Sequence, residues 1–259
     1  MTRRHVTFDC EGSQLVGTID AGNAATSGLL LVTGGNEVRS GAFAGQAQLA
    51  ASLAAKGFAV MRFDRRGVGD SEGPNGEFRS SAPDIAAALA AFREHCPALN
   101  RVVGFGNCDG ASALMLAQGG GCDALVLSNP WTFEGTGEDE QESPPEVVRD
   151  HYRKRLTDPA AIKRLLTGQV SLGKLFGSLI GALRPSAPPS SLAQDIANGI
   201  KHFAGDVTFL IADRDRTGKA FLAGWDKADP RIRVCPDATH AYVEPHAREW
   251  LEARLIEAL

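Results

Sequence analysis

Short apolar runs alternate with alanine- and leucine-rich stretches along most of the chain. Each run is mostly apolar without a strict polar alternation, which is typical of strands buried on both faces of a parallel sheet. These runs cover residues 28–32, 58–63, 101–105, 124–128, 207–212 and 232–235. Apolar residues recur at helical spacing in the other stretches, over residues 44–56, 82–95, 111–118 and 247–259. This alternation predicts a doubly wound α/β fold with a mostly parallel sheet.

Two segments near the N-terminus predict a β-hairpin that precedes the alternation. Residues 5–9 and 14–19 flank Glu11-Gly12-Ser13, where the glycine supplies the backbone freedom of a tight turn. Gly57 and Gly119 follow two of the predicted helices, at positions where C-caps are expected.

Residues 131–202 interrupt the pattern because they contain no convincing strand. The stretch opens with an acidic run, which we interpret as a solvated loop, and continues through Pro144-Pro145. Helical segments and a Pro/Ser-rich hinge follow, over residues 146–156, 159–166, 172–183 and 185–191. We interpret 131–202 as a helical cap inserted into a core made of residues 1–130 and 203–259.

Composition narrows the classes of protein that fit. The chain has 259 residues, 43% of them hydrophobic, and a net charge of -4, so it has enough apolar material for a folded core of one or two domains. The sequence pI of about 5.9 and the lack of a long basic run exclude an ordinary nucleic-acid binder. We also expect no membrane insertion and no secretory signal, because neither a long apolar run nor an apolar h-region is found.

The cysteines indicate the compartment. They are five in number and scattered without close pairs, at Cys10, Cys96, Cys108, Cys122 and Cys235. Free thiols fit a reducing environment better than a disulfide framework does. We therefore expect a cytoplasmic protein.

The sharpest local signal is Gly-Asn-Cys-Asp-Gly at residues 106–110, directly after an apolar run and at the start of a predicted helix. A nucleophile on a strained strand-to-helix turn needs glycines two residues to either side, where side chains would clash. Cys108 stands at the centre, and the helix N-terminus favours a thiolate there. Two points oppose this interpretation: free cysteines are often small buried core residues, and the Asp109 carboxylate would disfavour a thiolate that it faced.

A thiol nucleophile needs a base and an acid that orients the base. His240 lies in a loop between the last predicted strand and the final helix, whereas its nearest competitor, His246, lies at the start of that helix. The penultimate strand ends in Ala-Asp-Arg-Asp, so Asp213 and Asp215 are both placed to orient a histidine. The order nucleophile, acid, histidine is that of α/β-hydrolases.

Two glycine-containing loops follow the first two apolar runs. Thr33-Gly34-Gly35-Asn36 is able to supply a backbone N–H to an oxyanion, although such a segment can equally be only a turn. Residues 64–71 read Asp-Arg-Arg-Gly-Val-Gly-Asp-Ser, without the Lys-Ser/Thr ending of a P-loop or the third glycine of a dinucleotide fingerprint. We therefore expect no nucleotide, no other organic cofactor and no metal.

Three features together resemble the α/β-hydrolase fold superfamily over essentially the whole chain. They are the D-x-R-G-x-G-x-S pattern at 64–71, the strand-to-helix turn at 106–110 (the elbow), and the late Asp and His that follow the last two predicted strands. The cysteine also resembles that of dienelactone hydrolases. Further details are similar to the exosortase A system-associated hydrolase 1 group: Gly34-Gly35 with Arg39, residues 108–112, Asn129-Pro130-Trp131, His151-Tyr152, Lys154-Arg155-Leu156, and Asp215 with Thr217 and Phe221. The chain departs from that group at Asn36-Glu37, where Pro-Gln is expected, and at Asp213, where glycine is usual.

The resemblance implies roles for particular residues. Cys108 would be the nucleophile, His240 the base and Asp215 the orienting acid, while Asn36 and Asp109 would donate backbone N–H groups to the oxyanion. It implies hydrolysis of an ester, thioester or lactone carbonyl on a small or lipid-like acyl substrate, tied to bacterial exosortase or exopolysaccharide systems. Two alternatives remain: acyl transfer by the same triad, and a binding or scaffold protein on a hydrolase fold.

Overall fold

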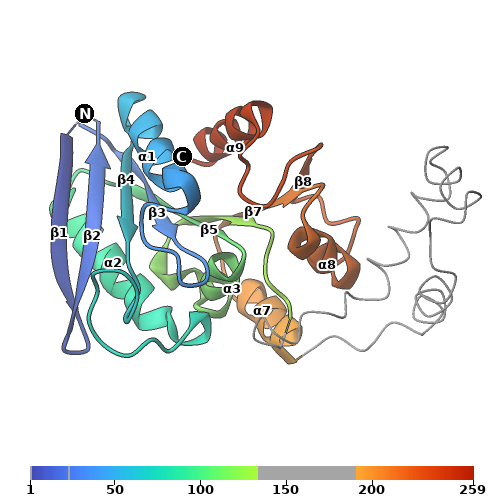
Figure 1. Cartoon of the computed structure of the whole chain (residues 1–259), viewed down its shortest axis with the longest axis horizontal. Helices are drawn as coiled ribbons and strands as arrows, with labels where there is room; N and C mark the ends of the chain where they lie inside the picture. Colours follow the sequence, from blue (N-terminus) through green and yellow to red (C-terminus); the bar gives the residue numbers. More distant parts are fainter. Residues whose placement is uncertain (1, 23, 134–190) are drawn as a thin grey trace, which may run out of the picture.

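The computed structural model describes residues 2–22, 24–133 and 191–259, which contain one eight-stranded sheet in the order β1-β2-β4-β3-β5-β6-β7-β8 (Figure 1). The strands β3 to β8 run parallel to one another, whereas β1 and β2 form an antiparallel hairpin added to β4. The strands are β1 (Thr2–Cys10), β2 (Ser13–Ala21), β3 (Ser27–Val32), β4 (Ala59–Phe63), β5 (Arg101–Asn107), β6 (Ala124–Ser128), β7 (Asp206–Ala212) and β8 (Ile232–Cys235).

Helices cover both faces of this sheet (Figure 1). One face carries α1 (Gly45–Ala55) and α9 (Pro245–Ala258). The other face carries α2 (Ala82–His95), α3 (Asp109–Leu116) and α7 (Ser191–Lys201). None of the helices in the described part of the chain is long and apolar enough to cross a membrane.

The central strand β3 shows how the two cores form. Leu29 and Leu31 pack in the core beneath α1 and α9, whereas Leu30 and Val32 pack in the core on the opposite face. All four side chains are buried, because successive residues of a strand point to opposite faces and both faces are covered. The predicted doubly wound, mostly parallel fold is confirmed.

The element boundaries follow the sequence signals closely. Each of the six predicted runs is a strand, and the N-terminal hairpin turns at Glu11-Gly12 with positive φ at both residues. Gly57 and Gly119 also have positive φ after the predicted helices. A further helix, α8 (Arg216–Gly224), follows β7 directly and begins where Asp215 caps its N-terminus.

The predicted cap lies largely outside the described residues, and so do the predicted helices at 146–156, 159–166 and 172–183 and the segment His151–Leu156. Its described end, helix α7, packs on α3: Ile196 and Ile200 are buried in the same core as Met115. A Cβ on Gly199 would lie 2.0 Å from the Met115 carbonyl oxygen, so the two helices are in close contact. Helix α7 therefore helps to cover the sheet, and the division into core and cap stays a prediction.

Candidate active site

The turn between β5 and α3 places Cys108 in a strained backbone conformation. Its φ of 61° and ψ of -130° are rare for a residue with a Cβ. A Cβ on Gly106 would lie 2.4 Å from the Gly110 carbonyl carbon, and a Cβ on Gly110 would lie 2.5 Å from the Val32 oxygen. Neither position has room for a side chain, which is the steric requirement that the sequence pattern predicts. The thiol is free and half-buried.

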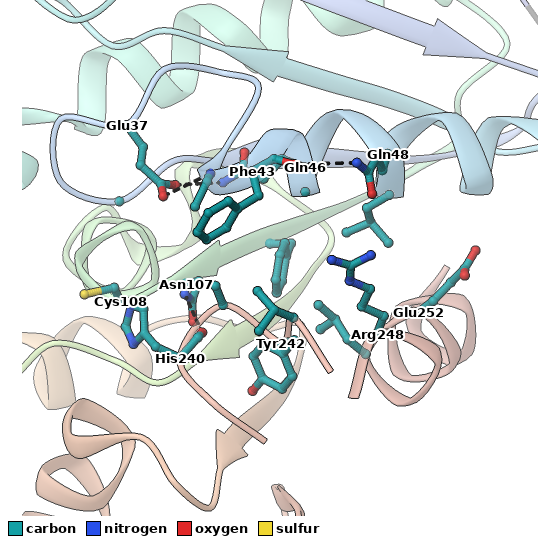
Figure 2. A pocket seen from close by; sticks show the side chains of 18 of the residues that line it. Glu37, Phe43, Gln46, Gln48, Asn107, Cys108, His240, Tyr242, Arg248 and Glu252 are labelled. Carbon is teal, nitrogen blue, oxygen red and sulfur yellow. Dashed lines mark hydrogen bonds between the residues drawn. The ribbon is translucent and has the colours of Figure 1, made fainter. Parts of the chain in front are cut away.

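His240 is held between an acid and this thiol. Its Nδ1 lies 3.0 Å from Asp215 Oδ1, and its ring also hydrogen-bonds the side chain of Cys108. The second carboxylate oxygen of Asp215 accepts a 2.8 Å hydrogen bond from the backbone N–H of Gly218, within the N-terminal turn of α8. The buried carboxylate therefore has a fixed orientation, and it fixes the imidazole in turn. Figure 2 shows the imidazole beside the thiol.

These contacts favour a protonated imidazole. The hydrogen bond with Asp215, and then the hydrogen bond with Cys108, raise the pKa of His240 to about 10, against the effect of burial. Burial raises the pKa of Asp215, but the hydrogen bond and charge of His240 outweigh it and leave that pKa below its usual value. An imidazolium beside a thiol is the electrostatic setting in which a thiolate is stabilised.

The rival residues lie outside this chain of contacts. The backbone N–H of Asp213 donates a hydrogen bond of 3.1 Å to the Cys235 carbonyl, whereas the carboxylate that pairs with His240 is that of Asp215. His246 lies on α9, where its Nε2 is 3.0 Å from the Pro236 carbonyl. The structure thus brings together Cys108, His240 and Asp215, although their catalytic roles remain predictions.

Two asparagines brace the site, and sequence reasoning missed both as functional candidates. The Asn107 side chain donates to the His240 carbonyl at 3.2 Å. Asn129 donates to Asn107 Oδ1 at 3.0 Å and accepts from the Ala212 N–H at 2.9 Å, while it is fully buried. It therefore joins the carboxyl ends of three neighbouring strands. One sequence signal was available for both asparagines. Each is a polar residue at the end of a buried strand, where a buried polar group needs hydrogen-bond partners.

The loop after β3 approaches the elbow through its glycines. A Cβ on Gly34 would lie 3.4 Å from the Cβ of Cys108. The Gly35 N–H donates to the Asp109 carboxylate at 2.5 Å. The side chain of Asn36 instead accepts from Asn75 at 2.7 Å. The loop donor predicted from the sequence is Asn36, whereas the loop N–H that bonds an elbow residue in the structure is that of Gly35. The donor roles of Asn36 and of the Asp109 N–H stay predictions.

The Asp-x-Arg-Gly segment after β4 supports this loop. The buried Asp64 carboxylate pairs with the Arg39 guanidinium and accepts from the N–H groups of Arg39 at 2.5 Å and Asp70 at 3.2 Å. Arg65 donates to the Gly35 carbonyl. The polar groups of the segment are thus engaged with the loop after β3, which gives the motif a bracing role.

A cavity of about 450 Å³ extends from Cys108 and His240 between α9 and the segment that leads into α1. Figure 2 shows Phe43 over this cavity and Arg248 and Glu252 at the end away from the thiol. Its apolar wall includes Phe43, Leu49, Phe105, Val243 and Leu251. Among the described residues, no three His, Cys, Asp or Glu side chains form a group able to hold a metal ion.

Residues 29–254 match the sequence profile of the Alpha/beta hydrolase family. The chain therefore belongs to this family, and the prediction of an α/β-hydrolase enzyme is confirmed at that level. No curated protein sequence matches the chain significantly.

Solved structures of the same fold support this assignment. Alpha/beta hydrolase GrgF from Penicillium sp. sh18 superposes with a TM-score of 0.66 at 16% identity, over 99% of this chain and 97% of that one. The Pyrococcus furiosus esterase Pf2001 gives a TM-score of 0.63 at 15% identity, over 99% and 89% of the two chains. XC6422 from Xanthomonas campestris, a serine hydrolase without a lid, gives 0.61 at 14% identity, over 100% and 96%. At these identities the likeness shows the fold.

Proposed function

We propose that this protein hydrolyses an ester, thioester or lactone carbonyl, with Cys108 as nucleophile, His240 as base and Asp215 as orienting acid. The observation that carries the proposal is the continuous chain of contacts from Asp215 through His240 to Cys108, at a cavity able to admit a small molecule. This is the arrangement of an activated nucleophile: nucleophile, base and a third group that orients the base.

The chemistry follows from that arrangement. His240 takes the proton of the Cys108 thiol, and the thiolate forms a bond to the carbonyl carbon of the substrate. Backbone N–H groups bind the oxygen that becomes negative, and His240 gives its proton to the departing alcohol or thiol. Water, deprotonated by His240, then attacks the acyl-cysteine and releases the acid. Throughout, Asp215 holds the imidazole and stabilises its charged form.

The proposed oxyanion donors are the N–H groups of Asp109 and of the loop after β3. Sequence reasoning assigns the loop donor to Asn36, and the proximity of Gly35 to the elbow adds its N–H as a second candidate. Each donor that contacts the oxyanion contributes about 3–4 kcal/mol to the stability of the transition state. The position of this loop therefore matters as much as the triad.

Comparison supports ester chemistry without fixing the substrate. One structural relative is an esterase, and another is described as a serine hydrolase. Here a cysteine occupies the nucleophile position, so thioesters and lactones belong in any substrate panel. The apolar wall of the cavity suits a small or lipid-like acyl group.

We also propose the finer assignment to the exosortase A system-associated hydrolase 1 group, in a bacterial exosortase or exopolysaccharide system. Its support is the set of matching segments, including Gly34-Gly35 with Arg39 and the elbow at 108–112. A cytoplasmic location is part of this proposal. All five cysteines are free, as expected of thiols in a reducing compartment.

The first experiment measures iodoacetamide labelling of Cys108 against pH in the wild type and in His240→Ala. We expect labelling to stay fast well below pH ~8.5, the ordinary thiol pKa, and to slow without His240. A panel of esters, thioesters and lactones is then tested on the wild type, Cys108→Ala and Cys108→Ser. Turnover by Cys108→Ala at the wild-type rate would overturn the proposal.

A further inference from the structure

The side chain of Asp109 occupies an unusual place in the site. Its Oδ1 accepts a hydrogen bond of 2.5 Å from the Gly35 N–H, and the neighbouring backbone N–H groups of Gly110 and Asp109 lower the pKa of the carboxyl. One of these N–H groups comes from the loop after β3, and the other two open helix α3, directly after Cys108. The carboxylate therefore lies among backbone N–H groups from both sides of the elbow and is bonded to that of Gly35.

These donors are the ones that an oxyanion on Cys108 needs. The N–H after the nucleophile, together with one from the loop after the first parallel strand, forms the oxyanion hole of this fold. The N-terminus of α3 adds the positive end of its helix dipole. Accepting the proposed hydrolysis, we propose that the Asp109 carboxylate occupies the oxyanion site of the free enzyme and that the substrate carbonyl has to displace it.

The surroundings make room for this placement. A Cβ on Gly34 would lie 2.5 Å from Asp109 Oδ1, so any larger residue at position 34 would push the carboxylate away. Arg65 is 3% exposed and holds the Gly35 carbonyl, and its charge attracts the Asp109 carboxylate. Gly34 therefore leaves space for the carboxylate, while the Gly35 N–H and the charge of Arg65 stabilise an anion at this point.

A bound carboxylate and an oxyanion compete for the same donors and repel each other. Protonation of Asp109 relieves the competition, because a neutral carboxyl accepts these hydrogen bonds more weakly. Burial raises the pKa of Asp109 more than Arg65 and the backbone N–H groups lower it. The other charged groups near the site are Glu37 on the loop after β3 and the imidazole of His240. Because its pKa is raised, we expect acid to weaken the hold of the Asp109 carboxylate on the oxyanion site.

The test compares Asp109→Ala and Asp109→Asn with the wild type. Both variants keep the backbone N–H of residue 109 and remove the charge. Asp195→Asn, on the exposed side of α7, is the control for the change in net charge. The readouts are kcat/KM on an active ester from pH 5 to 9 and the Kd of butanal, which adds to the thiol as a hemithioacetal whose oxygen enters the same site.

We expect Asp109→Ala to raise kcat/KM and tighten butanal binding by about tenfold at pH 8, since charged hydrogen bonds are among the stronger ones. The gain in kcat/KM should shrink toward one as the pH falls, and Asp109→Asn should show a smaller gain. Asp195→Asn should match the wild type.

An unchanged or lower kcat/KM together with unchanged butanal affinity in Asp109→Ala would overturn the inference. So would a gain that does not depend on pH. If Asp109→Ala does not fold, the isosteric Asp109→Asn decides by the same readouts. Cys108→Ala, measured alongside, separates the two proposals. Full activity of Cys108→Ala would refute the hydrolase mechanism. If Cys108→Ala is inactive and Asp109→Ala shows no gain, only the role of the carboxylate is refuted.

Discussion

The side chain of Asn107 donates a hydrogen bond of 3.2 Å to the backbone carbonyl of His240, 133 residues further along the chain. Asn107 is the last residue of β5 and immediately precedes Cys108. The residue that ends the strand before Cys108 therefore fixes the loop that carries His240. Through Asn107, Asn129 extends this connection to the end of β7, where Asp215 follows.

Replacing Asn129 with alanine should lower the free energy of unfolding by about 2–3 kcal/mol, because the buried Ala212 N–H and the Asn107 side chain both lose a partner. Urea unfolding measures the change. Asn198→Ala, at an exposed position on α7, is the matched control and should stay within about 0.5 kcal/mol of the wild type. Equal stability of the two variants would contradict the bracing role.

Asp215→Asn should reduce kcat/KM by at least about 100-fold, since the amide no longer holds the imidazole as its charged partner. The variant should also lower the pKa of His240 from about 10 toward 6.5, because its largest source of stabilisation is removed. NMR titration of the imidazole measures this shift. Asp213→Asn removes a carboxylate from the same loop and should leave both kcat/KM and the His240 pKa nearly unchanged. A larger effect of Asp213→Asn than of Asp215→Asn would assign the orienting role to Asp213.

Stability should depend on pH through the same pair. The pKa of His240 is raised in the folded state, so its contribution is complete below pH 6.5, the unfolded value, and is lost as the pH rises toward 10. Asp215 has a lowered pKa, so its contribution is present above pH 3.8 and is lost as the pH falls further. The Tm advantage of the wild type over His240→Gln should therefore be larger at pH 6 than at pH 10. A Tm difference that grows with pH would contradict the pairing.

Gly106→Ala should lower the free energy of unfolding by about 3 kcal/mol or more, because its Cβ would lie 2.4 Å from backbone that has no room to move. Gly45→Ala is the contrasting variant. Gly45 has helical dihedral angles and no atom within 4 Å of an added Cβ, so alanine should stabilise α1 by about 0.5 kcal/mol. Chemical denaturation of both variants tests the comparison, which fails if Gly106→Ala is as stable as the wild type.

The positions of β3 to β7 could be predicted from the sequence because these strands are buried at nearly every position and therefore appear as apolar runs. The edge strand β8 is shorter and more exposed, so its apolar signal is weaker. The start of α3 was harder to predict. Apolar spacing places it at residue 111, yet the helix begins at Asp109. The elbow forces the chain to turn at Cys108, and the helix begins at the next residue. Local strain thus set a boundary that periodicity does not report.

The candidate triad was also within reach of the sequence, because chain order and strand ends confine each member to one short loop. The choice between Asp213 and Asp215 was not, since both follow the same strand. Only the three-dimensional structure shows that Asp215 caps α8 and pairs with His240. Asn129 was missed as a site component for a related reason: its partners come from other segments of the chain.

The positive φ at residue 108 determines which residues can serve there. Serine differs from cysteine only in the γ atom and imposes no additional constraint on the backbone. Threonine is branched at the β carbon and would be strained in this conformation. Exchange between a sulfur and an oxygen nucleophile is therefore open to this scaffold by a single substitution, with no rearrangement of the main chain.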